Sequence, residues 1–169
     1  IPVTVHLIAL NDDFDELETI VSNISHSIAT NDPIYNLHQE YIPSNRISTE
    51  LKDNDYVGVI VWRQSLVTFE RGTNASYEIQ LRSRPLHDVF LSLYSGNDIL
   101  IQQQEIRFLN NTIDFRTNHT VIVSAVADNF DDPFISTTSI LHTATTDDNN
   151  YDGIQIPNVT VDVIDDDTA

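Results

Sequence analysis

The stretch VIVSAVADNFDD, residues 121–132, repeats an earlier stretch of the chain, VHLIALNDDFDE, residues 5–16. The two stretches lie about 116 residues apart and share their apolar alternation, an alanine, a phenylalanine and a run of acids. The same offset matches further side chains in order: His26 with His142, Asp32 with Asp148, and Tyr35 with Tyr151. Matches in this order predict an internal repeat.

Both copies end on acidic segments, RISTELKDND at 46–55 and NVTVDVIDDD at 158–167. The repeat period is therefore about 112–116 residues, the size of an immunoglobulin-like sandwich. We expect residues 56–169 to form a complete module and residues 1–55 to be the C-terminal half of a preceding one. Since the chain has no Met and begins inside a strand-like segment, we expect a piece of a longer protein.

The alternation and the residue types predict an all-β fold. Val, Ile, Thr, Tyr and Phe favour pleated, half-buried strands, and no segment of the chain shows clear helical periodicity. Only residues 15–24 are ambiguous, and their repeat partner at 132–140, with a proline and β-branched residues, favours a strand at both places. The predicted strands of the complete module lie at 56–62 and 65–70 (one opening strand, broken between the sheets), 75–83, 88–95, 106–110, 119–128, 136–146 and 158–165. We expect an immunoglobulin-like antiparallel β-sandwich of about seven strands, with about three strands in residues 1–55.

The net charge of −18, from 26 acidic and 8 basic residues, excludes several partners. Nucleic acid and anionic membrane surfaces need clustered Lys and Arg, which this chain lacks. No stretch is long and apolar enough for a membrane span, and no cysteine is present for disulfides or thiolate metal sites. Such strong self-repulsion predicts a positive partner, and a hard divalent cation is the obvious one.

The order of these motifs resembles the Calx-β family, whose modules occur in sodium–calcium exchangers and in large surface adhesins. The motifs that carry the resemblance are the Glu-x-Gly turn at Glu70 and Gly72, Leu81 and Pro85 ahead of the next strand, the acidic loop of residues 121–132, the stretch ILHTATTDDNNYDG at 140–153, and the closing Asp165, Asp166 and Asp167. Two departures concern the acidic sites: Arg71 stands where glycine is common, and Asn129 interrupts the acidic loop. The resemblance implies an immunoglobulin-like sandwich that binds Ca²⁺.

Acidic loops at one end of a sandwich can supply the 6–8 oxygen ligands that Ca²⁺ takes. We expect the carboxylates of one end to converge there with no basic residue among them. The candidate ligands of the complete module are Glu70, Asp128, Asp131, Asp132, Asp165, Asp166 and Asp167. Those of the preceding half-module are Asp12, Asp13, Asp15, Glu16, Asp53 and Asp55. The alternative is that acidic loop ends keep strands soluble and block edge-to-edge pairing.

Single residues allow further predictions. A cation at Asp53 and Asp55, directly between the modules, would stiffen the joint and give a semi-rigid rod. His26 and His142 are expected to be hydrogen-bonded strand histidines rather than metal ligands. Tyr35 and Tyr151 are expected to act like the tyrosine corner of immunoglobulin-like folds, and Trp62 to pack at the edge of the module.

Five Asn-x-Ser/Thr sequons suggest an extracellular glycoprotein: Asn23, Asn74, Asn110, Asn118 and Asn158. No nucleophile elbow, zinc-binding helix or phosphate-cradling loop is present, so catalysis is not expected. We expect a structural calcium-binding repeat module of a secreted or cell-surface fibrous, filament or adhesin protein. Its partners would be neighbouring modules of the same protein, or other copies in a filament. Two alternatives stay open: a regulatory calcium sensor, as in the exchangers, and a carbohydrate- or protein-binding adhesin tip.

Overall fold

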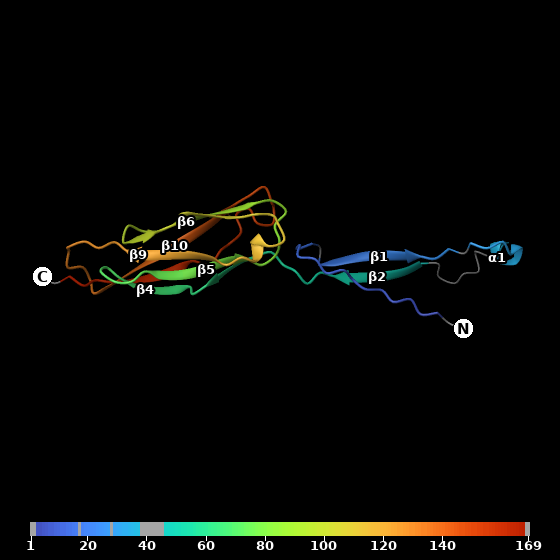
Figure 1. Cartoon of the computed structure of the whole chain (residues 1–169), viewed down its shortest axis with the longest axis horizontal. Coiled ribbons are helices and arrows are strands. Elements are labelled where there is room, and N and C mark those ends of the chain that lie inside the picture. Colours follow the sequence, from blue (N-terminus) through green and yellow to red (C-terminus); the bar gives the residue numbers. More distant parts are fainter. Residues whose placement is uncertain (1–2, 17, 28, 38–45, 168–169) are drawn as a thin grey trace. The chain divides into compact units, whose positions relative to one another are not determined.

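A computed structural model describes residues 3–16, 18–27, 29–37 and 46–167, and the chain divides into two compact units (Figure 1). The first unit comprises Ile1–Asp12 and Glu16–Asn54, and the second comprises Asp13–Asp15 and Asp55–Ala169. The three residues Asp13–Asp15 thus belong to the second unit, although the residues on both sides of them in the sequence belong to the first. Each unit is described below by itself.

The second unit is a sandwich of two β-sheets, which confirms the predicted all-β, immunoglobulin-like fold. The four-stranded sheet has the order β3-β5-β9-β7, formed by β3 (Val59–Trp62), β5 (Ala75–Leu81), β9 (His119–Ala125) and β7 (Ile99–Ile101). The five-stranded sheet has the order β4-β11-β10-β6-β8, formed by β4 (Ser65–Phe69), β11 (Val159–Ile164), β10 (Ile135–Thr145), β6 (Val89–Tyr94) and β8 (Glu105–Phe108). Strand β10 joins two partners, since its first half pairs with β11 and its second half with β6.

The opening strand is broken between the two sheets, as the sequence predicted. Strand β3 lies in one sheet and β4 in the other, and Arg63 between them has a left-handed backbone with φ of 64°. Strand β4 pairs in parallel with β11, from Ser65 opposite Thr160 to Phe69 opposite Ile164. Because parallel neighbours end at the same edge, the residues that follow β4 and β11 lie together.

The core follows the period of two in the strands. Alternate residues of β5, β6, β9 and β11 point inward, and the largest fully buried side chains include Tyr77, Phe108 and Phe115. Phe115 comes from the 3-10 helix η2 (Asp114–Arg116), which the sequence pattern does not predict. Strand β7 was also missed, since its three residues are too few for alternation to show.

Tyr151 plays the predicted tyrosine-corner part. Its hydroxyl donates to the backbone carbonyl of Ser83 over 2.7 Å and accepts from the Ser83 N–H over 3.1 Å. Both residues are buried, so this contact joins two distant parts of the chain inside the sandwich. The repeat partner Tyr35 instead lies 62% exposed in the short helix α1 (Pro33–Leu37), a helix that the sequence did not predict.

The prediction for His142 is also confirmed. Its Nε2 lies 2.7 Å from the hydroxyl of Tyr77, and both side chains are buried. Burial lowers the pKa of His142, so the neutral ring is favoured in the folded state. His26, its repeat partner, is exposed and lies just past the end of a strand, so it does not share this role. Trp62 ends the edge strand β3 and is partly exposed.

The first unit contains a hairpin of β1 (Thr19–Ser25) and β2 (Arg46–Lys52). Its register repeats that of β10 with β11: Thr19 faces Lys52 just as Ile135 faces Ile164. A backbone bond is repeated as well, because the Asp53 N–H donates to Glu18 over 3.3 Å and the Asp165 N–H donates to Phe134 over the same distance. The repeat seen in the sequence is therefore present in the backbone pairing.

The third strand expected in the first unit is absent, since residues 5–13 form no strand. Their repeat counterpart is β9, which pairs with β5 and β7 of the front half of its module. Among the described residues, no strand pairs with residues 5–13. Within the described part of this unit no residue is buried, and apolar side chains such as Val21 and Ile47 remain exposed.

Candidate metal site

Three segments of the second unit bring acids to one place. Glu70 follows β4 directly, Asp165 and Asp167 follow β11, and Asp128 lies in the loop after β9. The parallel pairing of β4 with β11 extends past both strands, because the Glu70 N–H donates to the Ile164 carbonyl over 3.2 Å. This pairing is what places Glu70 beside Asp165.

Carboxylate oxygens of Glu70, Asp165 and Asp167 lie within 4.8 Å of one another. Asp165 is only 7% exposed, and the N–H of Asp167 donates to its Oδ1 over 3.1 Å. Oε2 of Glu70 and Oδ2 of Asp167 are buried and accept no hydrogen bond. These two oxygen atoms have thus lost contact with water without gaining a hydrogen-bond donor. Their burial costs free energy of folding unless a cation binds them.

The electrostatics of Glu70 reflect this crowding. Burial raises the pKa of its carboxyl, and the negative charges of Asp128, Asp165 and Asp167 raise it further, against a hydrogen bond from the Asp128 N–H that lowers it. The ionised form of Glu70 is therefore less favourable in the folded protein than in water.

Arg71 corrects the expectation that no basic residue would lie among these acids. Its Nη2 donates to Oδ1 of Asp167 over 2.7 Å, and its Nε lies 3.9 Å from Asp166. Arg71 is adjacent to Glu70 in the turn, so the side chain reaches the acids that follow β11. The sequence shows an arginine at a position where glycine is usual. It does not show that the Arg71 side chain points toward these acids.

The other predicted ligands of this module do not join the group. Asp131 and Asp132 are exposed in the loop, and Asp166 is exposed and faces Arg71. Asp128 touches the group through its N–H and its charge, while its Oδ1 accepts from the Phe130 N–H over 2.8 Å. Three of the seven candidates thus offer ligand atoms together, and a fourth lies beside them.

The candidates of the half-module are divided between the two units. Asp12, Glu16 and Asp53 line one pocket of the first unit, where the Glu16 N–H donates to Oδ2 of Asp53 over 2.9 Å. Asp13 and Asp15 belong to the second unit instead and have partners there, and Asp55 belongs to it too. For the described residues, Glu70, Asp165 and Asp167 are the only three acids whose ligand atoms gather this closely.

The donor set suits a hard cation. Three carboxylates supply oxygen only, at positions fixed by two paired strands, and Ca²⁺ accepts such irregular oxygen shells. Sulfur is absent from the chain and no histidine belongs to the group, so the set does not favour the softer transition metals. The group could hold a divalent cation with water and backbone carbonyls completing its shell.

All five sequon asparagines are exposed. The side-chain amide of Asn110 donates to the Leu86 carbonyl, and that of Asn118 donates to Glu78. A glycan on either of these two would leave one N–H on the amide nitrogen to make this hydrogen bond.

The sequence matches no family model and no curated protein, so the resemblance to Calx-β modules stays a prediction. Solved structures similar to the chain include the periplasmic chaperone SfaE, with 7% identity and a TM-score of 0.48, and the E. coli chaperone DraB, with 6% and 0.45. Alignments cover 64% of this chain in both cases, and the chain spans 57% and 55% of those two structures. A cohesin–dockerin complex from Clostridium thermocellum is similar over 69% of this chain and 99% of the matched chain, with 16% identity and a TM-score of 0.44. Among the described residues no helix is long and apolar enough to cross a membrane.

Proposed function

We propose that the chain is a calcium-binding structural repeat module of an extracellular fibrous, filament or adhesin glycoprotein. The observation that carries the proposal is the group of Glu70, Asp165 and Asp167, whose oxygens lie within 4.8 Å while two of them are buried without a hydrogen-bond donor. A module of this kind supports neighbouring modules and carries no catalytic step.

The burial of the acids distinguishes a cation-binding site from acidic strand ends that only keep the protein soluble. Acids that only keep strand ends soluble remain in water, whereas Asp165 is 7% exposed and Oε2 of Glu70 is enclosed. Like charges at such distances repel by a few kcal/mol per pair at an effective dielectric near 20, as an order of magnitude. One arginine, Arg71, offsets part of this repulsion from outside the group, and a divalent cation would offset the rest.

A structural role is supported by the repeat. The two hairpins share their register, and the acids after β2 correspond to those after β11. Cations bound by the acids that close each module would stiffen the joints between successive modules. The extracellular assignment rests on the sequons, all of which are exposed.

Calcium titration followed by thermal melting tests the proposal. Millimolar Ca²⁺ is expected to raise the melting temperature relative to chelator, because the cation binds the folded state only. Glu70→Gln should remove most of that increase and, in chelator, should be more stable than the parent protein, since a neutral side chain avoids the burial of a charge and the repulsion that together raise the pKa of Glu70. Glu105→Gln, in the exposed β8 position, is the matched control and should behave like the parent. An unchanged melting temperature in Ca²⁺ and chelator would refute the calcium site.

Affinity and shape test the structural role. Structural extracellular modules bind Ca²⁺ at roughly 10⁻⁴–10⁻³ M, while intracellular sensors bind at roughly 10⁻⁷–10⁻⁵ M. Isothermal titration should give the weaker range, and mass analysis of the native protein should find glycan. Small-angle scattering with freely hinged modules in Ca²⁺ would count against stiffened joints.

A further inference from the structure

The segment Asp13–Asp15 covers one end of the second unit. The Arg84 guanidinium carbon lies 4.8 Å from the centroid of the Phe14 ring, a cation–π arrangement. On either side of that ring the chain makes polar contacts: Arg84 donates its N–H to the Asp13 carbonyl over 2.6 Å, and the Val57 N–H donates to Oδ2 of Asp15 over 2.8 Å. The Arg116 guanidinium forms an ion pair with Asp13.

The same segment occurs again at 129–131, where no described residue covers it in a comparable way. The repeat matches Phe14 with Phe130 and Asp15 with Asp131, while Asn129 replaces Asp13. Phe14 is half-buried, whereas Phe130 is 74% exposed. The loop is held by its own turn, in which the N–H of Phe130 donates to Asp128, so the ring is presented on an ordered backbone.

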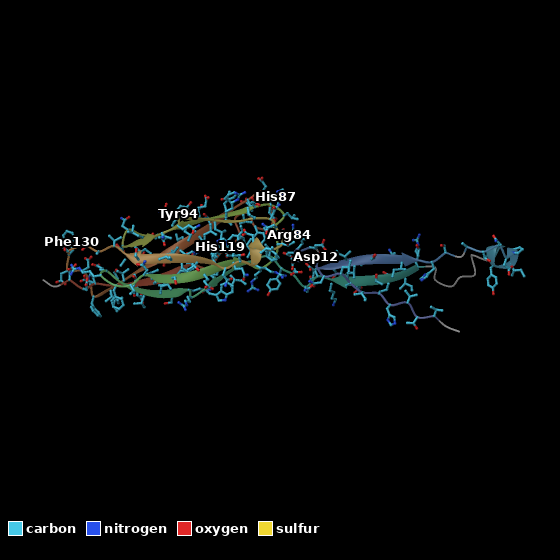
Figure 2. The ribbon with its side chains drawn as sticks, viewed as in Figure 1. Asp12, Arg84, His87, Tyr94, His119 and Phe130 are labelled. Carbon is cyan, nitrogen blue, oxygen red and sulfur yellow. The ribbon has the colours of Figure 1, made fainter. Side chains whose placement is uncertain are left out.

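Phe130 cannot use the surface on its own module. Figure 2 shows Phe130 at one end of the second unit and Arg84, with His87, at the opposite end. That surface is moreover already covered by Asp13–Asp15 of the same chain. The complement of Phe130 must therefore come from another copy.

We propose that the loop 128–132 is a docking element for a following module of the same kind. Phe130 lies under the arginine equivalent to Arg84, Asp131 accepts from the N–H equivalent to that of Val57, and the Asn129 amide oxygen accepts from the arginine equivalent to Arg116. Because the loop and its receptor surface lie at opposite ends of one module, the contact is heterologous and repeats from each module to the next. The inference rests on the proposed function only in taking modules to follow one another, and it does not require the cation.

A chain in which residues 56–167 are repeated directly after Asp167 tests the docking. This junction copies the natural one, since Asp167 corresponds to Asp55 and Tyr56 follows each. Nitrogen-15 label confined to the second copy by segmental ligation allows amide exchange of its residues 57 and 84 to be followed by NMR. Docking by Phe130 predicts slow exchange at both amides. Phe130→Ala should speed it about tenfold, which is the range of one partly buried cation–π contact.

Phe134→Ala is the matched control, because Phe134 is 72% exposed, lies four residues away and has no docking counterpart at Glu18. It should leave exchange of the second copy unchanged. With the label moved to the first copy, amides 57 and 84 stay protected by Phe14 in every variant, which shows that the fold is intact. Calcium binding is titrated on the same chains and should not change with Phe130→Ala. Exchange that is equally fast, or equally slow, with and without Phe130 overturns the docking proposal while leaving the cation site untouched.

Discussion

Tyr151→Phe removes one oxygen atom from the sandwich, and its cost can be worked from the contacts of that atom. The hydroxyl lies 2.7 Å from the Ser83 carbonyl, 3.1 Å from the Ser83 N–H and 3.0 Å from the Ser83 hydroxyl. Ser83 is 1% exposed, so water does not replace these partners. A buried polar group left unsatisfied costs about 1–3 kcal/mol, and two backbone groups lose a partner here. We expect the free energy of unfolding to fall by about 2–4 kcal/mol.

Urea unfolding followed by tryptophan fluorescence measures this loss, because Trp62 is the single tryptophan and lies in β3 of the same unit. Tyr35→Phe is the control: the repeat places the same residue there, but it is 62% exposed and should change the stability by less than about 0.5 kcal/mol. The reasoning is refuted if both variants unfold at the parent midpoint, or if the Tyr35 variant loses as much as the Tyr151 variant.

Two further substitutions use the same repeat as an internal control. Burial lowers the pKa of His142, so the unfolded chain takes up a proton first as the pH falls below the ordinary histidine value near 6.5. The free energy of unfolding should therefore decline as the pH falls below that value, as urea unfolding at several pH values would measure. His142→Gln should flatten this decline, while His26→Gln should leave it as steep as in the parent protein. Equal slopes in both variants would contradict the role given to the buried His142. Asp148→Ala should cost about 2–3 kcal/mol, because the buried carboxylate accepts from the Leu86 N–H over 2.7 Å and from the Asn150 N–H over 2.9 Å. Asp32→Ala removes the matching local bond to the Ile34 N–H at an exposed site, and a loss of equal size there would argue against burial as the cause.

Much of the fold could be predicted because strand alternation is a local property of the sequence. The inward residues of β5 and β11 appear as alternate apolar positions in the printed sequence, and the broken opening strand appears as two short apolar runs. Alternation alone does not decide between helix and strand for residues 15–24. The repeat does, because the matching stretch in the second copy contains a proline, which favours a strand at both places.

The failures have a common physical cause: they depend on contacts between residues that are far apart in the sequence. Residues 5–13 have the pattern of a strand, yet no strand in the described part of the chain pairs with them. Asp13 and Asp15 stand in an acidic run that is typical of cation ligands. In the structure Asp13 instead forms an ion pair with Arg116, and Asp15 accepts a hydrogen bond from the Val57 N–H. Arg71 was read as a missing glycine, whereas its guanidinium acts as a counter-charge for Asp167.

The parallel pairing of β4 with β11 also determines how the second unit would bear tension. β11 is the last strand of this unit and β4 comes directly after the first, β3, and five residue pairs join β4 with β11, from Ser65 with Thr160 to Phe69 with Ile164. When the chain ends are pulled apart, β4 and β11 slide past each other along their length. Their slanted hydrogen bonds then bear the force together, in shear. An antiparallel terminal pair pulled from one edge would instead open bond by bond. Resistance to force depends on the rate of unfolding, and this geometry slows the separation of β4 from β11.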